Sequence, residues 1–448
     1  MTSTLTVTDL KARVSNTIDA HAAELEQFAR DVFAEPELGF KEHKTAERVQ
    51  AWFDRMGLPH QDGIGVTGTK AVFDTGAPGP TVAVLGELDS LLSWEHPERN
   101  RTTGAVHACG HNAQLAIMLG AGLALRELAP QLAGRIALMA VPAEEYVELE
   151  ERLGMRAMGK LEFLGGKAEM VRLGAFDDVD IAMMVHATAR PEDEDIAVGG
   201  TNNGMVAKFV RFLGKTSHAG GAPDQGINAL SGARVAMAGI DAIRETFRDE
   251  DHVRVHPIIT RGGDVVNAIP ADVRVETFCR GATMEAIELA HRKVDRALKA
   301  GALAIGGSVE ITTLPGYLPL HHDPTLVSLF RANAVDVVGA ENVRDKGHGS
   351  GSTDMGDVSH ILPSVHPYAG GATGAGHGAD YRIADYQKVV INPAKAMAMT
   401  VIDLLSEDAR EAKRVKSEFK PLMSKDDYLA YLRRLDTKVV WRADEHDG

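Results

Sequence analysis

The chain has 448 residues, of which 44% are hydrophobic and 25% are charged, and its net charge is −15. This composition is that of a globular protein too long for one ordinary hydrophobic core, so we expect two domains. The net negative charge argues against nucleic acid or an anionic membrane as a partner, and an aromatic content of 5% offers no platform for stacking single-stranded nucleic acid.

The first part of the chain alternates predicted helices and strands. Apolar residues recur at helical spacing over 8–33 and 45–56, and a uniformly apolar run predicts a buried helix at 115–125. The charged stretch 148–173 is predicted to be a solvated helical cover. Strands are predicted at 70–74, 81–86, 134–141 and 181–185. The last three strands are apolar throughout, which is typical of strands inside a parallel or mixed sheet with both faces covered.

Chemically active side chains follow three of these strands. Glu87 and Asp89 follow the strand at 81–86, Glu144 and Glu145 follow the strand at 134–141, and His186 follows the strand at 181–185. Because the carboxyl ends of strands form the usual site edge of an α/β sheet, we expect these side chains to meet.

A second signal is a cluster of metal-binding residue types just before the predicted helix at 115–125. His107, Cys109 and His111 occur within five residues. On an extended segment all three would point to one side, whereas a turn at Gly110 would make them converge. A single Cys or His usually packs in the core, but three so close together favour a site for an ion such as zinc, manganese or cobalt.

The middle of the chain has a different pattern. Predicted strands and helices follow one another in the order β-α-β-β-α-β, which is the ferredoxin-like order. Their approximate ranges are 206–214, 226–247, 253–259, 273–279, 284–303 and 308–313. We therefore predict an inserted α+β domain at 198–314, between two parts of an α/β catalytic domain at 1–197 and 315–448.

The last part of the chain returns to α/β character. Helices are predicted at 325–338 and 393–405, and the signal over 407–448 is weak. Two glycine-rich loops, at 347–357 and 370–380, lack the Lys of a phosphate-binding loop, so we interpret them as close backbone approaches to a site.

Five motifs in this order resemble those of the M20 metallopeptidase and amidohydrolase family, especially its amidohydrolases similar to the B subunit of p-aminobenzoyl-glutamate hydrolase. The motifs are His107-Ala-Cys-Gly-His-Asn, Pro142-Ala-Glu-Glu, Ser217-His-Ala-Gly-Gly-Ala-Pro, Asn267-Ala-Ile-Pro-Ala and Gly376-His-Gly-Ala-Asp. The resemblance covers about residues 20–405. It implies an α/β, mixed-sheet metallohydrolase domain with an inserted ferredoxin-like lid through which two copies form a homodimer.

The resemblance also implies roles for single residues. His218 matches a lid histidine that stabilises the oxyanion in the neighbouring subunit's site, and Asn267 and Arg280 match positions that contact the substrate, often at its carboxylate. Glu144 matches the general base, and Asp89, which the family retains, is grouped with it as catalytic. The matched metal ligands are Cys109, His111, Glu145, His186 and His377.

Several positions depart from the family pattern or stay outside it. Asn112 stands where many members have Asp, and Glu87 stands where the wider family often has a His ligand, so Glu87 is not expected to bind metal. His107 is expected behind the ligands, and Cys279 in the core. We expect one or two divalent ions per subunit, Mn²⁺ or Zn²⁺, with Co²⁺ as a further candidate. Other histidines without a motif are expected to be structural or exposed: His321, His322, His348, His360 and His366.

The leading functional hypothesis is hydrolysis of a C–N bond, the amide of an N-acyl or N-aroyl amino acid with a free carboxylate, by a metal-activated water with Glu144 as base. One alternative is hydrolytic deamination of an aromatic amine such as 5-nitroanthranilate, which would release ammonia. Another is a non-catalytic subunit of a hydrolase complex, although the full ligand set with a base argues for chemistry. Two cysteines make no disulfide framework, and we see no signal peptide or membrane-length apolar run, so we expect a cytoplasmic protein.

Overall fold

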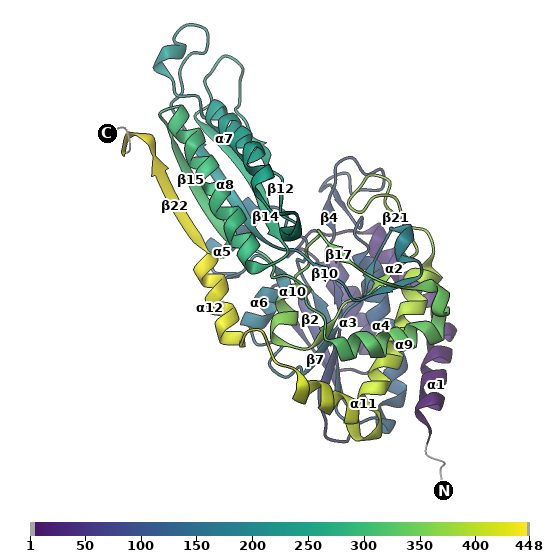
Figure 1. The fold of residues 1–448 in the computed structure, drawn as a ribbon. Coiled ribbons are helices and arrows are strands. Elements are labelled where there is room, and N and C mark those ends of the chain that lie inside the picture. The colour runs from purple at the N-terminus through teal and green to yellow at the C-terminus, as the bar shows by residue number, and fades with distance from the viewer. Residues whose placement is uncertain (1–4, 446–448) are drawn as a thin grey trace. The chain divides into compact units, whose positions relative to one another are not determined.

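The computed structural model describes residues 5–445, which divide into two compact units (Figure 1). Unit 1 comprises the chain up to Thr201, His321–Gly347 and Asp357–Ser424. Unit 2 comprises Asn202–Leu320, His348–Gly356 and the described residues from Lys425 onward.

The main sheet of unit 1 is mixed, with the strand order β1-β2-β6-β3-β7-β18. β1, β2 and β6 pair antiparallel, whereas β6, β3, β7 and β18 run parallel to one another. These strands are β1 (His60–Ile64), β2 (Gly68–Asp74), β3 (Thr81–Glu87), β6 (Arg135–Val141), β7 (Ile181–Met183) and β18 (Ser364–Val365). β3 and β6 are buried almost throughout, which explains why neither shows the alternation of a half-exposed strand.

A smaller sheet of unit 1 has the order β16-β9-β19-β8. Its strands are β8 (His186–Ala187), β9 (Ile196–Val198), β16 (Val343–Asp345) and β19 (Tyr368–Ala369). Further short strands are β4 (Leu91–Leu92), β5 (Ala105–Val106), β10 (Thr201–Asn202), β17 (His348–Gly349), β20 (Ala372–Thr373) and β21 (Arg382–Ile383).

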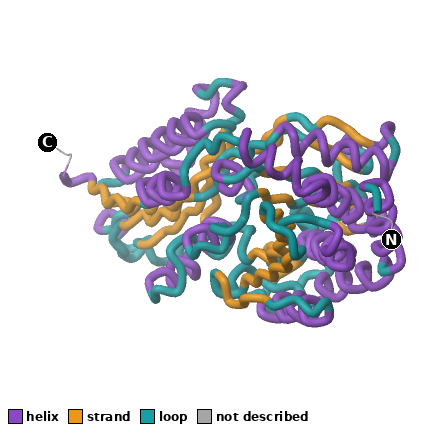
Figure 2. Tube along the Cα trace, turned by 90° about the horizontal axis from the view of Figure 1, so that it is seen from below, coloured by secondary structure: helices purple, strands orange, loops and turns teal. Residues whose placement is uncertain are grey.

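Helices flank the strands of unit 1, as the purple and orange segments of Figure 2 show. They are α1 (Val7–Ala20), α2 (Ala22–Ala34), α3 (His43–Arg55), α4 (His111–Leu128), α5 (Leu149–Ala157), α6 (Gly166–Arg172), α9 (Pro324–Val338) and α11 (Asn392–Glu418), with α10 (Met355–Ile361) crossing the boundary between the units. The expected helix at 8–33 is divided at His21, and β1 was not predicted, because its residues are mostly polar and exposed.

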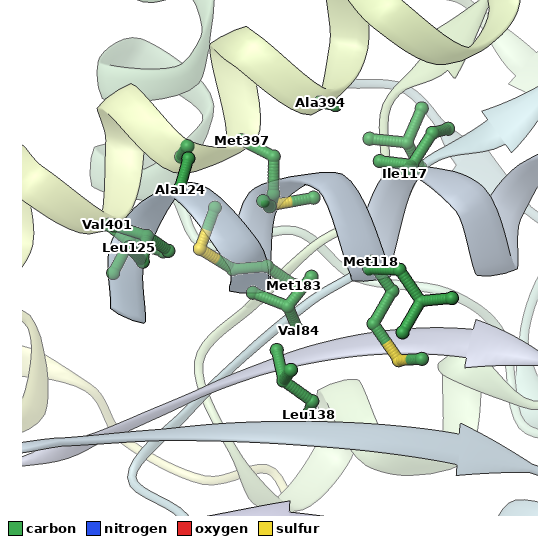
Figure 3. Packing of buried hydrophobic residues seen from close by; sticks show 14 of the residues in the cluster. Val84, Ile117, Met118, Ala124, Leu125, Leu138, Met183, Ala394, Met397 and Val401 are labelled. Atoms are coloured by element: carbon green, nitrogen blue, oxygen red, sulfur yellow. The ribbon is translucent and has the colours of Figure 1, made fainter. Parts of the chain in front are cut away.

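The core of unit 1 is built around α4, which lies between the sheet and α11 (Figure 3). Met118 and Leu125 of α4 belong to one hydrophobic cluster with Val84 of β3 and Met397 of α11. Nearly every residue of α4 up to Leu125 is buried, so the helix is apolar on all sides. This packing fixes the start of α4, at His111, against the ends of the strands.

Within the described residues, Gln387–Glu418 is long and apolar enough to cross a membrane, although we expected no stretch of that kind. The apolar window of this segment has a mean hydropathy of 1.4, and 83% of it is buried by the rest of the protein. α11 packs there against α1, α4 and α9, as a central core helix does.

Unit 2 is an antiparallel sheet with the order β12-β14-β11-β15-β22, and β13 also pairs with β14. α7 and α8 lie side by side on this sheet (Figure 1). The β-α-β-β-α-β order is the one predicted. The elements are α7 (Ala229–Ile243), α8 (Met284–Ala304), α12 (Lys425–Leu435), β11 (Gly204–Leu213), β12 (Arg254–Val255), β13 (Ile258–Arg261), β14 (Asp272–Gly281), β15 (Ser308–Pro315) and β22 (Thr437–Arg442).

The end of the chain differs from its expected place. We assigned 315–448 entirely to the catalytic domain, but the described residues from Lys425 onward belong to unit 2. The reason is that β22 adds to the outer edge of β15, pairing Thr437 with Thr313 and Arg442 with Ser308. The signal over this segment was weak because β22 is an exposed edge strand with no buried apolar face.

Candidate metal centre

The ends of three parallel strands of unit 1 meet as predicted. β3 pairs in parallel with both β6 and β7, so their carboxyl ends lie at one edge of the sheet. Glu87 ends β3, Glu144 and Glu145 follow β6, and His186 follows β7. All four carboxylate or imidazole side chains are brought together there with the start of α4.

Gly110 turns the chain into α4 between Cys109 and His111. Its φ is +92°, and a Cβ at this position would lie 2.6 Å from the Cβ of Ala187 and 2.7 Å from the hydroxyl of Tyr381. Glycine is therefore required both by the backbone conformation and by the close packing. The turn places the Cys109 thiol and the His111 ring on the same side, next to the strand ends.

Asp89 orients the ring of His111. The Nδ1 of His111 donates to the backbone carbonyl of Asp89 at 2.9 Å and lies 3.3 Å from its carboxylate Oδ1. The Nε2 is buried, makes no hydrogen bond, and lies 3.1 Å from Oε2 of Glu87 and 3.9 Å from Oε2 of Glu144. A ring that is held through Nδ1 presents Nε2 as a ligand atom, which is how histidine ligands in metal sites are commonly oriented.

Donor atoms gather in three overlapping groups, each with its atoms within 4.8 Å of one another. Cys109 belongs to two of the groups and His111 to two. The groups are Cys109 with His111 and His186, Cys109 with Glu145 and His377, and Glu87 with His111 and Glu144. The five ligands predicted from the sequence thus lie in two adjacent groups that share the thiolate-forming Cys109.

The donor set fits a divalent cation. Thiol, imidazole and carboxylate are the ligand types of zinc and manganese sites. Among the described residues, the buried atoms His111 Nε2, Glu145 Oε1 and Glu87 Oε2 make no hydrogen bond. Buried polar atoms are nearly always satisfied, so such a cluster indicates a site for an ion.

Charge and burial shift the ionisation of these groups. Burial, together with the charge of Glu145, holds the pKa of the Cys109 thiol well above its usual value. Burial, together with His111, lowers the pKa of His186 to about 4, so its ring is neutral and able to bind metal. Sγ of Cys109 lies 3.3 Å from Nε2 of His186.

Lys167 is a site residue that the sequence did not reveal. Its Nζ donates to Oε1 of Glu87 at 2.5 Å, and both side chains are fully buried. Burial alone would raise the pKa of Glu87, but Lys167 and the nearby histidines lower it to about 2. We expected residues 148–173 to be solvated, and nothing in the seven residues of α6 marks one Lys as internal.

His377 reaches the site from a glycine-rich loop. Its φ is +63°, its backbone N–H donates to the carbonyl of Ala108, and its Nε2 lies 3.4 Å from Oε1 of Glu145. Its side chain is 57% exposed, which makes it the most accessible of the predicted ligands.

Two other histidines are buried beside the site. His107 has no hydrogen bond at either ring nitrogen, and burial lowers its pKa to about 3. His366, expected to be structural or exposed, is also buried, with its ring centroid 5.8 Å from that of His186. It directly follows β18, which runs parallel to β7, so the same strand-end rule would have identified it.

The three remaining predicted residues lie in unit 2. Nδ1 of His218 accepts hydrogen bonds from the backbone N–H groups of Gly220 and Gly221. The next residue, Ala219, donates to the carbonyl of Asn267, so the two motif loops lie together.

Arg280, the third of these residues, lies on β14 directly opposite Arg254 of β12. Both line a cavity of about 410 Å³ together with His256, Glu276 and Phe278. The lining is therefore rich in groups that bind anions.

The family model described as Peptidase family M20/M25/M40 matches residues 83–399. The chain belongs to this family. Family M20 members are hydrolases, and the protein is accordingly a metal-dependent hydrolase, as the resemblance predicted.

Relatives of known activity extend over most of the chain. The Xaa-Arg dipeptidase of Mus musculus is 29% identical, with 94% of each chain covered. One of the subunits of the p-aminobenzoyl-glutamate hydrolase of Escherichia coli is 28% identical, with 69% of each chain covered.

Solved structures share the fold. The aminobenzoyl-glutamate utilization protein of Klebsiella pneumoniae has a TM-score of 0.65 at 21% identity, covering 87% of this chain and 98% of that chain. The YXEP protein of Bacillus subtilis, described as a dinuclear metal binding peptidase, has a TM-score of 0.61 at 19% identity, covering 86% and 99%.

Proposed function

We propose that the protein hydrolyses the amide bond of an N-acyl or N-aroyl amino acid that carries a free carboxylate. The observation that carries this proposal is the position of Glu144, a nearly buried carboxylate 3.9 Å from the ligand nitrogen of His111 and next in sequence to the ligand Glu145. A base beside a metal centre is what amide hydrolysis by water requires.

The residues divide the work as follows. Cys109, His111, Glu145, His186 and His377 would hold the metal. When bound, a divalent cation there supplies Lewis acidity that polarises the scissile carbonyl and acidifies the attacking water. Glu144 takes the proton of that water at its carboxylate and passes it to the leaving nitrogen, while Asp89 keeps His111 in the ligating orientation.

The shared position of Cys109 in two donor groups supports two ions per subunit, because one thiolate can contribute to both groups. Manganese and zinc both suit a mixture of thiolate, imidazole and carboxylate, and cobalt is a third candidate. The titration of metal-free protein with each ion, followed by calorimetry, gives both the preference and the stoichiometry.

The substrate carboxylate is assigned to unit 2. Arg280 and Asn267 are proposed to contact it, and the basic cavity shared by Arg280, Arg254 and His256 supports an anionic group there. His218 is proposed to stabilise the oxyanion in the site of a second copy, so that the active form is a homodimer assembled through unit 2. We further propose a cytoplasmic location.

A product assay tests the proposal. Metal-loaded protein is offered two panels, N-acyl or N-aroyl amino acids and amino-substituted nitroaromatics, while amino acid and ammonia are measured separately. Released amino acid supports amide hydrolysis, whereas ammonia from an aromatic amine would replace it with hydrolytic deamination. Neither product from protein with bound metal would contradict both and favour a non-catalytic subunit.

A further inference from the structure

The turn that presents Glu144 has an unusual backbone. It comprises Pro142–Glu145 and follows β6 directly. Ala143 has a φ of +49°, in the left-handed region that residues with a side chain rarely adopt. Such a conformation persists only where surrounding contacts hold it.

Glu42, in α3's N-terminal loop, supplies one of these contacts from a fully buried position. Its Oε1 accepts the backbone N–H of Ala143 at 2.8 Å, and its Oε2 accepts the hydroxyl of Thr67 at 2.6 Å. The carbonyl of Ala143 accepts the N–H of Gly166 at 3.1 Å. Both backbone polar groups of Ala143 are therefore bonded, and one of the two partners is a side chain.

The residue after Glu144 is held in the same way. The N–H of Glu145 donates to Oδ2 of Asp89 at 2.8 Å, and the carbonyl of Glu145 accepts from buried Arg152 at 2.6 Å. Glu144 thus lies between two residues whose backbone N–H groups are fixed by buried carboxylates, those of Glu42 and Asp89. A shift at either anchor would move the carboxylate of Glu144.

A buried carboxylate is an expensive way to fill space, since an apolar side chain would pack there without the cost of desolvation. Burial and the charge of Asp89 raise the pKa of Glu42 to about 7, which shows how poorly this location suits an anion. The acceptor atoms of Glu42 are what an apolar residue could not replace.

We propose that Glu42 is a positioning residue for the general base: it holds the turn at Ala143 so that Glu144 faces the metal centre, and it touches neither metal nor substrate. This inference rests on the proposed role of Glu144. It concerns a residue 102 positions earlier in the chain, in the Glu37-to-Thr45 segment that the proposed reaction does not otherwise use.

The test compares replacements that differ in the acceptor alone. Glu42→Leu fills the volume but leaves the N–H of Ala143 without a partner, and we expect kcat to fall ~100-fold, the effect of a displacement near 1 Å, with KM and metal content unchanged. Glu42→Gln keeps an acceptor and is expected to retain most of the activity. Thr67→Val removes only the hydrogen bond to the other oxygen and serves as the matched control.

A double-mutant cycle separates positioning from general damage. If Glu42 acts through Glu144, Glu42→Leu causes no further loss in the Glu144→Gln background, because the displaced group is already inactive. Additive losses, a loss of metal, or equal losses in the Leu and Thr67→Val variants would overturn the proposal. Should Glu42→Leu fail to fold, Glu42→Asp tests the same point, since its shorter side chain keeps the charge and withdraws the acceptor.

The outcomes also separate this inference from the proposed function. Full activity in Glu144→Gln would remove Glu144 as the base and with it the role of Glu42. An inactive Glu144→Gln together with a fully active Glu42→Leu would leave the proposed function standing and contradict only the positioning role.

Discussion

Glu144 and Glu145 are neighbours in sequence, yet their side chains have different surroundings. Glu145 shares a donor group with Cys109 and His377, whereas Glu144 approaches His111. The turn at Ala143 makes this separation possible, because on a regular strand the two side chains would point to opposite faces of the sheet. One carboxylate can then bind metal while the other moves protons.

Replacing Glu144 by Gln tests that division. We expect kcat to fall by about 100-fold to 10,000-fold, since a proton-transfer group is lost, while bound metal stays at the wild-type level. Turnover numbers and metal analysis by mass spectrometry give both values. Activity within about tenfold of wild type would contradict the role of base.

Cys109 and Cys279 provide a matched pair of buried thiols. Cys109 lies in two donor groups, whereas Cys279 packs in the core of unit 2, where burial raises its pKa to about 12. We expect Cys109→Ala to lower the metal content and Cys279→Ala to leave it unchanged. Equal metal content in both variants would remove Cys109 from the ligands.

At the scale of elements, α6 acts on the metal centre through one side chain. The helix has only seven residues, and it delivers the Lys167 ammonium to Glu87 at the end of β3. A buried ion pair of this kind adds little net stability, but breaking it leaves one charge buried without its partner. The pair therefore constrains Glu87 more than it stabilises unit 1.

Removing Lys167 should reveal this in a pH-dependent way. The pKa of Glu87, about 2 in the folded protein, lies below its usual value of 4.5, so its contribution to stability is present above pH 4.5 and is lost as the pH falls towards 2. In Lys167→Met burial instead raises that pKa, so the stability deficit of the variant is largest at neutral pH, ~3 kcal/mol, and shrinks on acidification.

Urea unfolding of metal-free protein at several pH values measures this deficit. The double variant Glu87→Gln with Lys167→Met is the control, and we expect it to recover most of the lost stability because no buried charge remains. A deficit that does not change with pH would show that the Lys167 side chain acts by packing alone.

At the scale of the whole molecule, unit 2 has two unlike sheet edges. β22 covers the edge of β15, whereas β12 and β13 form the opposite edge, where Ile258 and Ile259 are exposed. An exposed apolar edge strand can pair with a second chain, and it is on this edge that the proposed homodimer would form.

Mixing two inactive variants tests the proposed dimer and the role of His218 together. In a mixed dimer of His218→Ala and Glu144→Gln, one site would contain an intact Glu144 and receive an intact His218 from its partner. Random mixing should then restore about a quarter of wild-type activity. No recovery, with mixed dimers verified by native mass spectrometry, would show that His218 does not act across the interface.

Prediction from sequence succeeded where a rule links local pattern to place. Apolar strands with polar ends located Glu87, Glu144 and His186, because parallel strands must end at one edge of the sheet. Lys167 and Glu42 escaped prediction because their importance lies in contacts with residues 80 and 101 positions away, which no periodicity encodes. β22 escaped because an exposed edge strand carries no apolar pattern.

The pairing of β22 with β15 also has a consequence for biosynthesis. Domains generally fold as units while the ribosome is still adding residues. Here the outer strand of unit 2 is made after nearly all of unit 1, so the sheet of unit 2 can be completed only once the C-terminal segment has emerged. During translation β15 is therefore an unprotected edge, and a nascent chain stalled before Thr437 should be more prone to aggregate than the finished protein.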